Sequence, residues 1–265
     1  MRRFLLPPPA EVGDKYGSSV VPVEAIARIA SSVRVLRRSL EIGKHLADDP
    51  YTRYVAAFCE QGLALCGESW GFMDIVSVLY AAAELGQPEN YLEIGVRRGR
   101  SICAVVSASP RTHVYAFDMW QPGYANNENP GPDLVRRETR KVGFEGPLEF
   151  IDGDSHRTVP AFLARNPSLT FDLITVDGDH SLDGAWDDLR NVTPRLRVGG
   201  VLVFDDTANP YTPGLDAVWA RLLQVDAGLQ GFSYGALGAG VSFAIRRRPL
   251  GRDIPKKRKP WPRAF

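Results

Sequence analysis

A strand–turn–helix unit begins in the sequence Tyr91-Leu92-Glu93-Ile94-Gly95-Val96-Arg97-Arg98-Gly99-Arg100-Ser101. Its first residues are apolar and predict a short strand, two glycines predict a turn, and the apolar run 102–106 predicts a helix. In such a turn, glycine removes Cβ where a ligand must approach, and the helix N-terminus offers free N–H groups to an anion. The glycine spacing is neither the GxGxxG of a dinucleotide site nor the GK[ST] pattern of a phosphate loop.

Apolar strands and helical segments alternate outward from this unit. Further strands are expected at 113–117, 148–151, 171–176 and 200–204, with helices at 133–142 and from about His156 and Leu182. This alternation predicts an α/β fold with a parallel, doubly wound sheet. A helix ending near residue 225 and a hairpin of strands near 231–234 and 241–246 complete the domain, which we place at residues 87–248.

The flanking segments differ in character from this domain. Residues 1–86 are interpreted as an N-terminal segment and helical cap, in which the proline-rich residues 1–22 are loosely held. Apolar side chains at helical spacing predict one cap helix through residues 26–40, and others are expected at about 51–65 and 70–85. Residues 249–265 form a basic tail, for which disorder is favoured over a nuclear-import signal.

Composition excludes several classes of protein. The 265 residues carry a formal net charge of +1, which gives no overall field toward nucleic acid or a membrane surface. No apolar run is long enough for a membrane helix. Three cysteines without CxxC spacing argue against a disulfide framework or a zinc site and fit a reducing cytoplasm. We therefore expect a cytoplasmic protein that acts on a small molecule, with a homodimer through the cap as a further expectation.

Polar residues follow every predicted parallel strand. In strand order they are Glu93, Gly95, Gly99 and Ser101; Asp118; Asp154 and Ser155; Asp177, Asp179 and His180; and Asp205 and Asp206. Ligands bind at the carboxyl ends of strands in open α/β sheets, and a single acidic strand end is usually a helix cap. So many polar strand ends in register indicate a ligand site. Three further acids, Asp183, Asp187 and Asp188, follow at helical spacing and are expected on a solvated face.

Three of these acids predict a metal site. Asp177, Asp205 and Asp206 are expected to meet at neighbouring strand ends, where carboxylates repel one another unless a cation lies among them. A hard divalent ion such as Mg²⁺ prefers carboxylate oxygens and can lower the pKa of a bound hydroxyl. His180 lies three residues past Asp177, and its ordinary pKa of about 6.5 suits it to accept that proton. We assign the three acids as metal ligands, and His180 with Asp177 as the catalytic residues.

Together these motifs resemble those of class I S-adenosylmethionine (SAM) methyltransferases. The set comprises LEIGxxxGxS, an acid after the second strand, GxS after the third, Asp-x-x-His after the fourth and Asp-Asp after the fifth. It is similar to the metal-dependent O-methyltransferases of the catechol type, and more so to the group that methylates bacterial natural products and sugars. The phrases VDGDHSLDGAWDDL and LRVGGVLVFDDT are typical of a bacterial branch of that group. The resemblance covers about residues 90–245.

The resemblance implies a Rossmann-like seven-stranded sheet of order 3-2-1-4-5-7-6 that binds SAM. The implied cofactor-binding residues are Glu93, Gly95, Gly99 and Ser101 for the methionine part, Asp118 for the ribose, Asp154 and Ser155 for the adenine, and Asp177. Two departures concern the acceptor side: His180 stands where the catechol enzymes have lysine, and Asp206 where they have asparagine. The loop 121–132 and the cap also differ from the small catechol enzymes, which leaves the methyl acceptor open.

Three hypotheses from different classes remain open. The first is Mg²⁺-assisted O-methylation of a small hydroxylated molecule, such as a natural product, a sugar or a phenol. The second is a metal-independent N- or O-methyltransferase in which His180 acts alone. The third is a SAM-binding protein without turnover, which works as a partner protein through its cap. A nicotinamide-dependent reductase is disfavoured by the glycine spacing.

Overall fold

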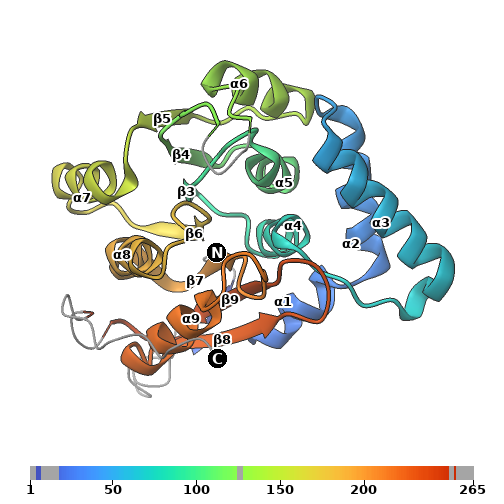
Figure 1. The fold of residues 1–265 in the computed structure, drawn as a ribbon. Helices are drawn as coiled ribbons and strands as arrows, with labels where there is room; N and C mark the ends of the chain where they lie inside the picture. The colour runs from blue at the N-terminus through green and yellow to red at the C-terminus, as the bar shows by residue number, and fades with distance from the viewer. Residues whose placement is uncertain (1–3, 7–17, 124–127, 251–253, 255–265) are drawn as a thin grey trace.

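The computed structural model describes residues 4–6, 18–123, 128–250 and 254, and a mixed sheet forms its centre (Figure 1). The strands of this sheet are β3 (Asn90–Ile94), β4 (His113–Asp118), β5 (Leu148–Asp152), β6 (Phe171–Val176), β7 (Leu196–Asp205), β8 (Leu229–Tyr234) and β9 (Val241–Arg246). Seven strands lie in the order β5-β4-β3-β6-β7-β9-β8, with β9 antiparallel to both of its neighbours. Counted from β3, this order is 3-2-1-4-5-7-6, which confirms the predicted Rossmann-like fold.

Helices cover both faces of the sheet. They are α1 (Val23–Ala30), α2 (Val33–His45), α3 (Pro50–Cys66), α4 (Ile75–Gly86), α5 (Arg100–Ala108), α6 (Pro132–Lys141), α7 (Ser155–Arg165), α8 (Leu182–Val192) and α9 (Leu215–Val225), with short 3₁₀ turns η3 (Gly67–Ser69) and η5 (Thr193–Arg195). One face carries α1, α4 and α5, and the other carries α7, α8 and α9 (Figure 1). Outside α4, the pair α2 and α3 forms an additional layer.

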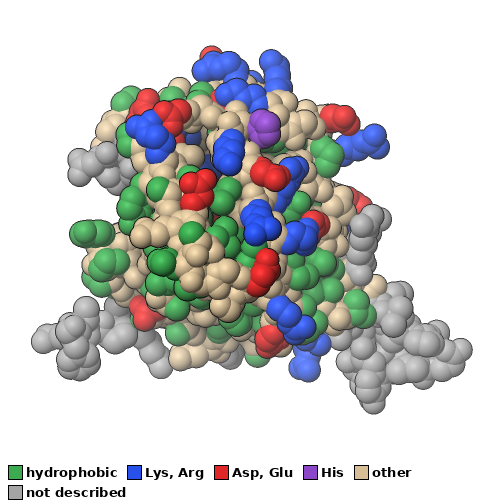
Figure 2. All heavy atoms as spheres, turned by 90° about the vertical axis from the view of Figure 1, so that its right-hand side faces the viewer, with side chains coloured by type: hydrophobic (Ala, Val, Ile, Leu, Met, Phe, Trp, Pro, Cys, Tyr) green, Lys and Arg blue, Asp and Glu red, His purple; other side chains and the backbone are tan. Residues whose placement is uncertain are grey.

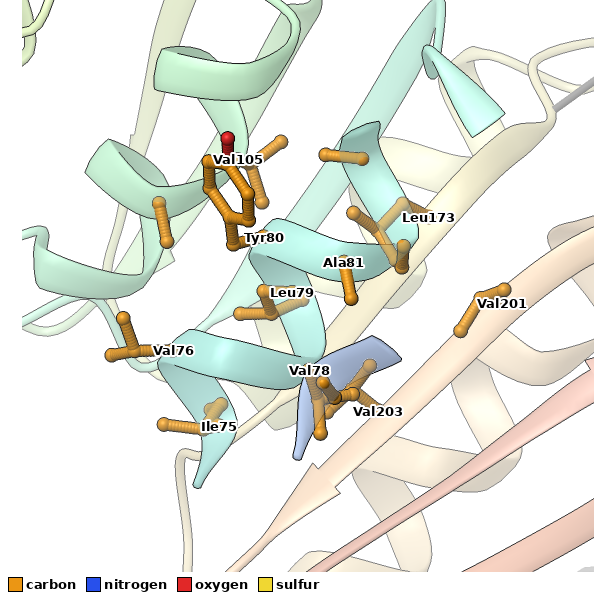
Figure 3. Packing of buried hydrophobic residues seen from close by; sticks show 14 of the residues in the cluster. Ile75, Val76, Val78, Leu79, Tyr80, Ala81, Val105, Leu173, Val201 and Val203 are labelled. Atoms are coloured by element: carbon orange, nitrogen blue, oxygen red, sulfur yellow. The ribbon is translucent and has the colours of Figure 1, made fainter. Parts of the chain in front are cut away.

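Side-chain alternation along the strands divides the core into two halves. Tyr91, Leu173 and Val201 point toward α4 and α5, whereas their neighbours Leu92 and Ile174 point toward α7 and α8. Figure 3 shows the side chains of α4 packed against β6 and β7. Both faces of the central strands β3 and β6 are buried, and their sequences are mostly apolar rather than alternating, as expected for a doubly wound sheet.

The N-terminal helices differ from the sequence expectation in two places. The single helix expected through residues 26–40 is divided into α1 and α2, because Ser32 caps the second helix by accepting a hydrogen bond from the Val35 N–H. Helix α4 begins at Ile75 rather than near residue 70, because Asp74 and Ser77 form a capping box. Helix α4 also packs on α5 and β7, so the helix layer of the sheet begins before residue 87.

Both ends of the chain are described only in part. Near the N-terminus, β1 (Leu5–Leu6) pairs with β2 (Ser18–Ser19), and the side chain of Phe4 is buried in the core beside α1 and α4. The rest of the N-terminal 17 residues lies outside the described residues, as does most of the predicted basic tail. Within the described part of the chain, no helix combines the length and apolar character that a membrane crossing requires.

Candidate active site

A cleft with a volume of about 840 Å³ opens at the carboxyl ends of the parallel strands. The predicted site residues that line it are Gly95, Ser101, Asp118, Asp154, Ser155, Asp177, His180, Asp205 and Asp206. Glu93 and Gly99 are the two predicted site residues that do not line it. Its volume falls within the usual range for sites that bury a small ligand. The topology therefore brings together residues that are more than 100 positions apart in sequence, as the strand-end argument anticipates.

The two glycines of the turn allow neighbouring parts of the protein to pack closely against it. Gly95 has φ 87°, and a Cβ there would lie 1.9 Å from the backbone oxygen of Asp177. Gly99 has φ 74°, and a Cβ there would lie 2.7 Å from Cγ1 of Val135. Glycine at these positions thus allows the end of β3 to approach the end of β6 and α5 to approach α6. Gly95 also lines the cleft, so its close packing and the ligand site coincide.

Glu93 lies beneath the turn, fully buried. Its carboxylate accepts a hydrogen bond of 2.6 Å from the Ser101 hydroxyl and a second from the Tyr91 hydroxyl. The Tyr91 hydroxyl also lies 2.9 Å from Oγ1 of Thr175 on the neighbouring strand. Burial raises the pKa of Glu93 to about 8. Glu93 therefore joins the start of α5 to two strands from inside, while Ser101 reaches the cleft wall.

Asp118 binds the turn from the end of β4. Its Oδ2 accepts hydrogen bonds of 2.8 Å from the backbone N–H groups of Val96 and Arg97. Its Oδ1 accepts bonds of 2.7 Å from the Trp120 N–H and 2.8 Å from the Asn129 side chain. Arg97 and Trp120 have φ angles of 50° and 51°, a left-handed conformation that costs energy in residues with a Cβ. Asp118 stabilises this strained backbone at both positions.

The residues that follow β5 cap α7 and lie close to a buried acid of α8. The Asp154 side chain caps α7 by accepting a 2.9 Å hydrogen bond from the His156 N–H, and Ser155 lines the cleft beside it. The ring Nε2 of His156 lies 3.8 Å from a carboxylate oxygen of Asp179 and 3.8 Å from one of Asp188. Asp188 is 0% exposed, and burial raises its pKa to about 6. The expectation that Asp188 lies on a solvated face is therefore wrong.

At the ends of β6 and β7, His180 lies between two carboxylates. Its Nε2 is 3.2 Å from Oδ1 of Asp177, and its Nδ1 is 3.3 Å from Oδ2 of Asp206. A neutral imidazole has one N–H and can donate to only one of them, whereas the imidazolium donates to both. The hydrogen bond with Asp177 accordingly raises the pKa of His180. Ligand atoms of Asp177, His180 and Asp206 lie within 4.8 Å of one another, a geometry able to hold a metal ion.

Asp205 lines the same cleft but is not part of that group among the described residues. Burial, followed by the charges of Asp177 and Asp206, raises the pKa of Asp205 well above its ordinary value. Burial and the charge of Asp177 also raise the pKa of Asp206, whose φ of 59° is left-handed. Concentrated negative charge of this kind favours a proton or a cation at the site. The structure thus groups two of the three predicted ligands, Asp177 and Asp206, with His180, and places Asp205 in the same cleft outside that group.

The cap contributes residues to the cleft that sequence reasoning missed. Tyr51 of α3 lies with the guanidinium groups of Arg97 and Arg100 at 5.7 and 5.3 Å from its ring centre. Arg98 lies 3.5 Å from Asp49, the residue that caps α3. The arginines stand in the run that contains the turn, so their presence at the cleft mouth could have been inferred. No local signal in the sequence indicates that Tyr51 comes to meet them.

Comparison with known proteins agrees with this geometry. Residues 92–207 match a protein-family model described as a methyltransferase domain. No curated protein sequence matches the chain significantly.

Solved structures share the fold along most of the chain. An S-adenosylhomocysteine (SAH)-bound methyltransferase from Podospora anserina, PaMTH1, is 17% identical with a TM-score of 0.53, over 92% of this chain and 98% of that one. An O-methyltransferase from Bacillus cereus in complex with SAH is 14% identical with a TM-score of 0.51, over 83% and 97%. TomG, a Streptomyces achromogenes O-methyltransferase involved in tomaymycin synthesis and solved with SAM, is 19% identical with a TM-score of 0.50, over 80% and 89%. The family-model match over residues 92–207 and the shared fold agree with the predicted resemblance: that part of the chain matches a methyltransferase domain, and the chain has the fold of these SAM- and SAH-binding methyltransferases.

Proposed function

We propose that this protein transfers the methyl group of SAM to a hydroxyl group of a small molecule, assisted by a divalent cation such as Mg²⁺. The observation that carries the proposal is the cluster of Asp177, His180 and Asp206 in the strand-end cleft. A purely structural sheet has no need of two carboxyl groups in contact with one imidazole at neighbouring strand ends.

The proposed SAM site follows the cleft from β3 to β6. Ser101 and the turn at Gly95 would hold the methionine part, and the uncapped N-terminus of α5 favours its carboxylate. Asp118 would accept hydrogen bonds from the ribose, and Asp154 with Ser155 would lie beside the adenine. Asp118 already accepts four hydrogen bonds, two on each oxygen, so a ribose hydroxyl would take the place of a present donor such as the Asn129 side chain. Glu93 would act indirectly, through Ser101.

The donor set fits a hard cation. Asp177 and Asp206 would supply carboxylate oxygens, which Mg²⁺ prefers, and Asp205 lies beside them in the cleft, where a bound cation would favour its ionised form. When bound, the cation would favour the ionised form of the acceptor hydroxyl. His180 can fill one of two roles, because its single lone pair binds either a cation or the proton of the acceptor. In the metal-independent alternative, His180 accepts that proton while Asp177 orients its ring through the 3.2 Å contact.

Calorimetry and an SAH-release assay with hydroxylated acceptors test the proposal. We expect SAM to bind with or without Mg²⁺, and turnover to stop in EDTA and return with added Mg²⁺. Asp206→Asn should lose the Mg²⁺ isotherm while keeping SAM affinity, and Asp216→Asn, an exposed acid of α9, is the matched control. Turnover that ignores EDTA but is lost in His180→Ala would establish the metal-independent alternative. SAM binding without turnover on any acceptor would favour the partner-protein hypothesis, and no SAM binding at all would refute all three.

The outer surface of α2 and α3 is the surface on which we base the proposed assembly. Figure 2 shows the face on the side of α2 and α3, where charged side chains of both signs are interspersed with hydrophobic ones. Tyr54 and Leu65 of α3 are exposed hydrophobic residues. We propose a cytoplasmic enzyme that forms a homodimer through this cap and does not bind nucleic acid. Light scattering of the purified protein tests the homodimer, since a monomeric mass at micromolar concentration contradicts it.

A further inference from the structure

A second cavity lies inside the helical cap, beside the active-site cleft. It is a partly open pocket with a volume of about 220 Å³ between α2, α3 and the start of α4, and Lys44, Asp48 and Arg53 are among its lining residues. Its apolar walls include Leu36 and Leu40 of α2, Ala56 and Cys59 of α3, and Phe72. We call this cavity the cap chamber. We propose that the cap chamber binds an apolar arm, such as an aryl group, of the methyl acceptor, whose hydroxyl lies at the acid–histidine cluster; this inference rests on the proposed function.

The cap chamber and the cleft share a wall. Leu46, Thr52, Val76 and Arg100 line both of them. On the chamber side of this wall, Asp74 forms an ion pair of 3.2 Å with Arg100. A ligand that spans the wall therefore meets polar groups at its centre and apolar groups at its far end.

The cap chamber is also close to the acid cluster. Asp74, which lines the chamber, pairs with Arg100, which lines both places. The Arg100 guanidinium lies 5.3 Å from the ring centre of Tyr51, and Tyr51 lines the cleft together with Asp205 and Asp206. One small molecule can therefore occupy both places at once.

The volume and lining indicate the chemical class of the arm. Protein interiors are close-packed, and apolar cavities of about 150 Å³ already bind benzene. The cap chamber exceeds that volume, so a phenyl ring fits. Cys59 offers no reactive thiolate, because burial raises its pKa to about 12. Among the acceptor classes left open, the apolar lining of the cap chamber favours a phenol or an aromatic natural product. An unsubstituted sugar has no apolar group to bury there.

The test compares two ligands in calorimetry of the full chain loaded with SAH and Mg²⁺. The ligands are catechol and 4-phenylcatechol, which differ by one phenyl group. We expect 4-phenylcatechol to bind at least about tenfold more tightly, from burial of the additional apolar surface. In Ala56→Phe, which fills the cap chamber, the ratio of the two dissociation constants should fall to about 1. The matched control is Ala57→Phe, at an exposed neighbour on the same helix, which should keep the wild-type ratio.

A second variant, Ser39→Leu, fills the cap chamber from α2 and serves if Ala56→Phe does not fold. All variants should keep the wild-type affinity for SAH. A wild-type ratio near 1, no binding of 4-phenylcatechol to the SAH-loaded protein, or an undiminished ratio in both filled variants would overturn the inference while leaving methyl transfer intact. Failure of the wild-type protein to bind SAH would instead refute the proposed function, and the inference with it.

Discussion

Replacing Glu93 by glutamine should remove a pH-dependent loss of stability. The carboxyl group is fully buried and contacts only two hydroxyl groups, those of Ser101 and Tyr91, among its hydrogen-bond partners in the described structure. Burial raises its pKa from 4.5 to about 8. At neutral pH the folded protein therefore keeps this proton, whereas the unfolded chain has released it. Glutamine has nearly the same shape but carries no proton to release.

The size of the effect follows from the two pKa values. Because the folded-state pKa is the higher one, the stabilisation from Glu93 is complete below pH 4.5 and is lost progressively as the pH rises to about 8. Each pH unit in this window costs about 1.4 kcal/mol of unfolding free energy. Between pH 5 and pH 8, the unfolding free energy of Glu93→Gln should therefore rise by roughly 3 kcal/mol relative to the wild type.

Urea unfolding followed by circular dichroism at pH 5, 6, 7 and 8 measures this difference directly. Glu60→Gln, an exposed position on α3, is the matched control and should show no comparable trend. SAH affinity at pH 7 should stay within a few-fold of the wild type, because Glu93 does not line the cleft. A difference between Glu93→Gln and wild type that does not change with pH would show that Glu93 is ionised in the folded protein and would refute the reasoning.

Three further predictions concern single side chains. Asp118→Ala removes the acceptor of four hydrogen bonds and should weaken SAH binding by about tenfold or more by calorimetry, whereas unchanged affinity would remove Asp118 from the ribose site. Gly95→Ala places a Cβ 1.9 Å from a backbone oxygen and should lower the melting temperature far more than Gly143→Ala, which has φ 84° but open space; equal losses would assign the cost to φ alone. Asp226→Asn breaks the buried 2.8 Å ion pair with Arg246 and should cost roughly 3–5 kcal/mol in urea unfolding. A loss below 1 kcal/mol would mean that Arg246 finds another partner.

The sheet could be predicted because its strands are marked locally. The run Phe171–Val176 is apolar except for Asp172 and Thr175 and is followed by polar residues, so both the strand and its end can be recognised from the sequence. The division between α1 and α2 was harder to see, since apolar spacing from Ile26 to Leu40 continues across the break. The available signal was Ser32, whose side chain caps α2. Periodicity reports which face is buried, whereas a cap reports where a helix begins, and the two must be considered together.

The site could be predicted at the strand ends and not elsewhere. Topology alone brings Asp118, Asp177 and Asp206 to one edge of the sheet, so their convergence required only the strand order. The burial of Asp188 had a signal that was overlooked, because Asp188 lies at helical spacing from the apolar residues Ala185 and Val192, which are buried on the same face of α8. The place of Tyr51 was hidden, since it depends on how the cap docks.

The docking of the cap separates cofactor binding from acceptor choice. The segment between α2 and α3 is attached to the methyltransferase domain by polar contacts: the Ala47 N–H donates to Glu138 of α6, and Asp49 pairs with Arg98 of the turn. The strand ends that would hold SAM belong to the sheet, whose register is set by the buried core. Substitutions inside the cap chamber can therefore alter which acceptor fits without moving the strand ends. The cap, which departs from the catechol pattern, lies outside the sheet, whereas His180 lines the cleft at the strand ends themselves.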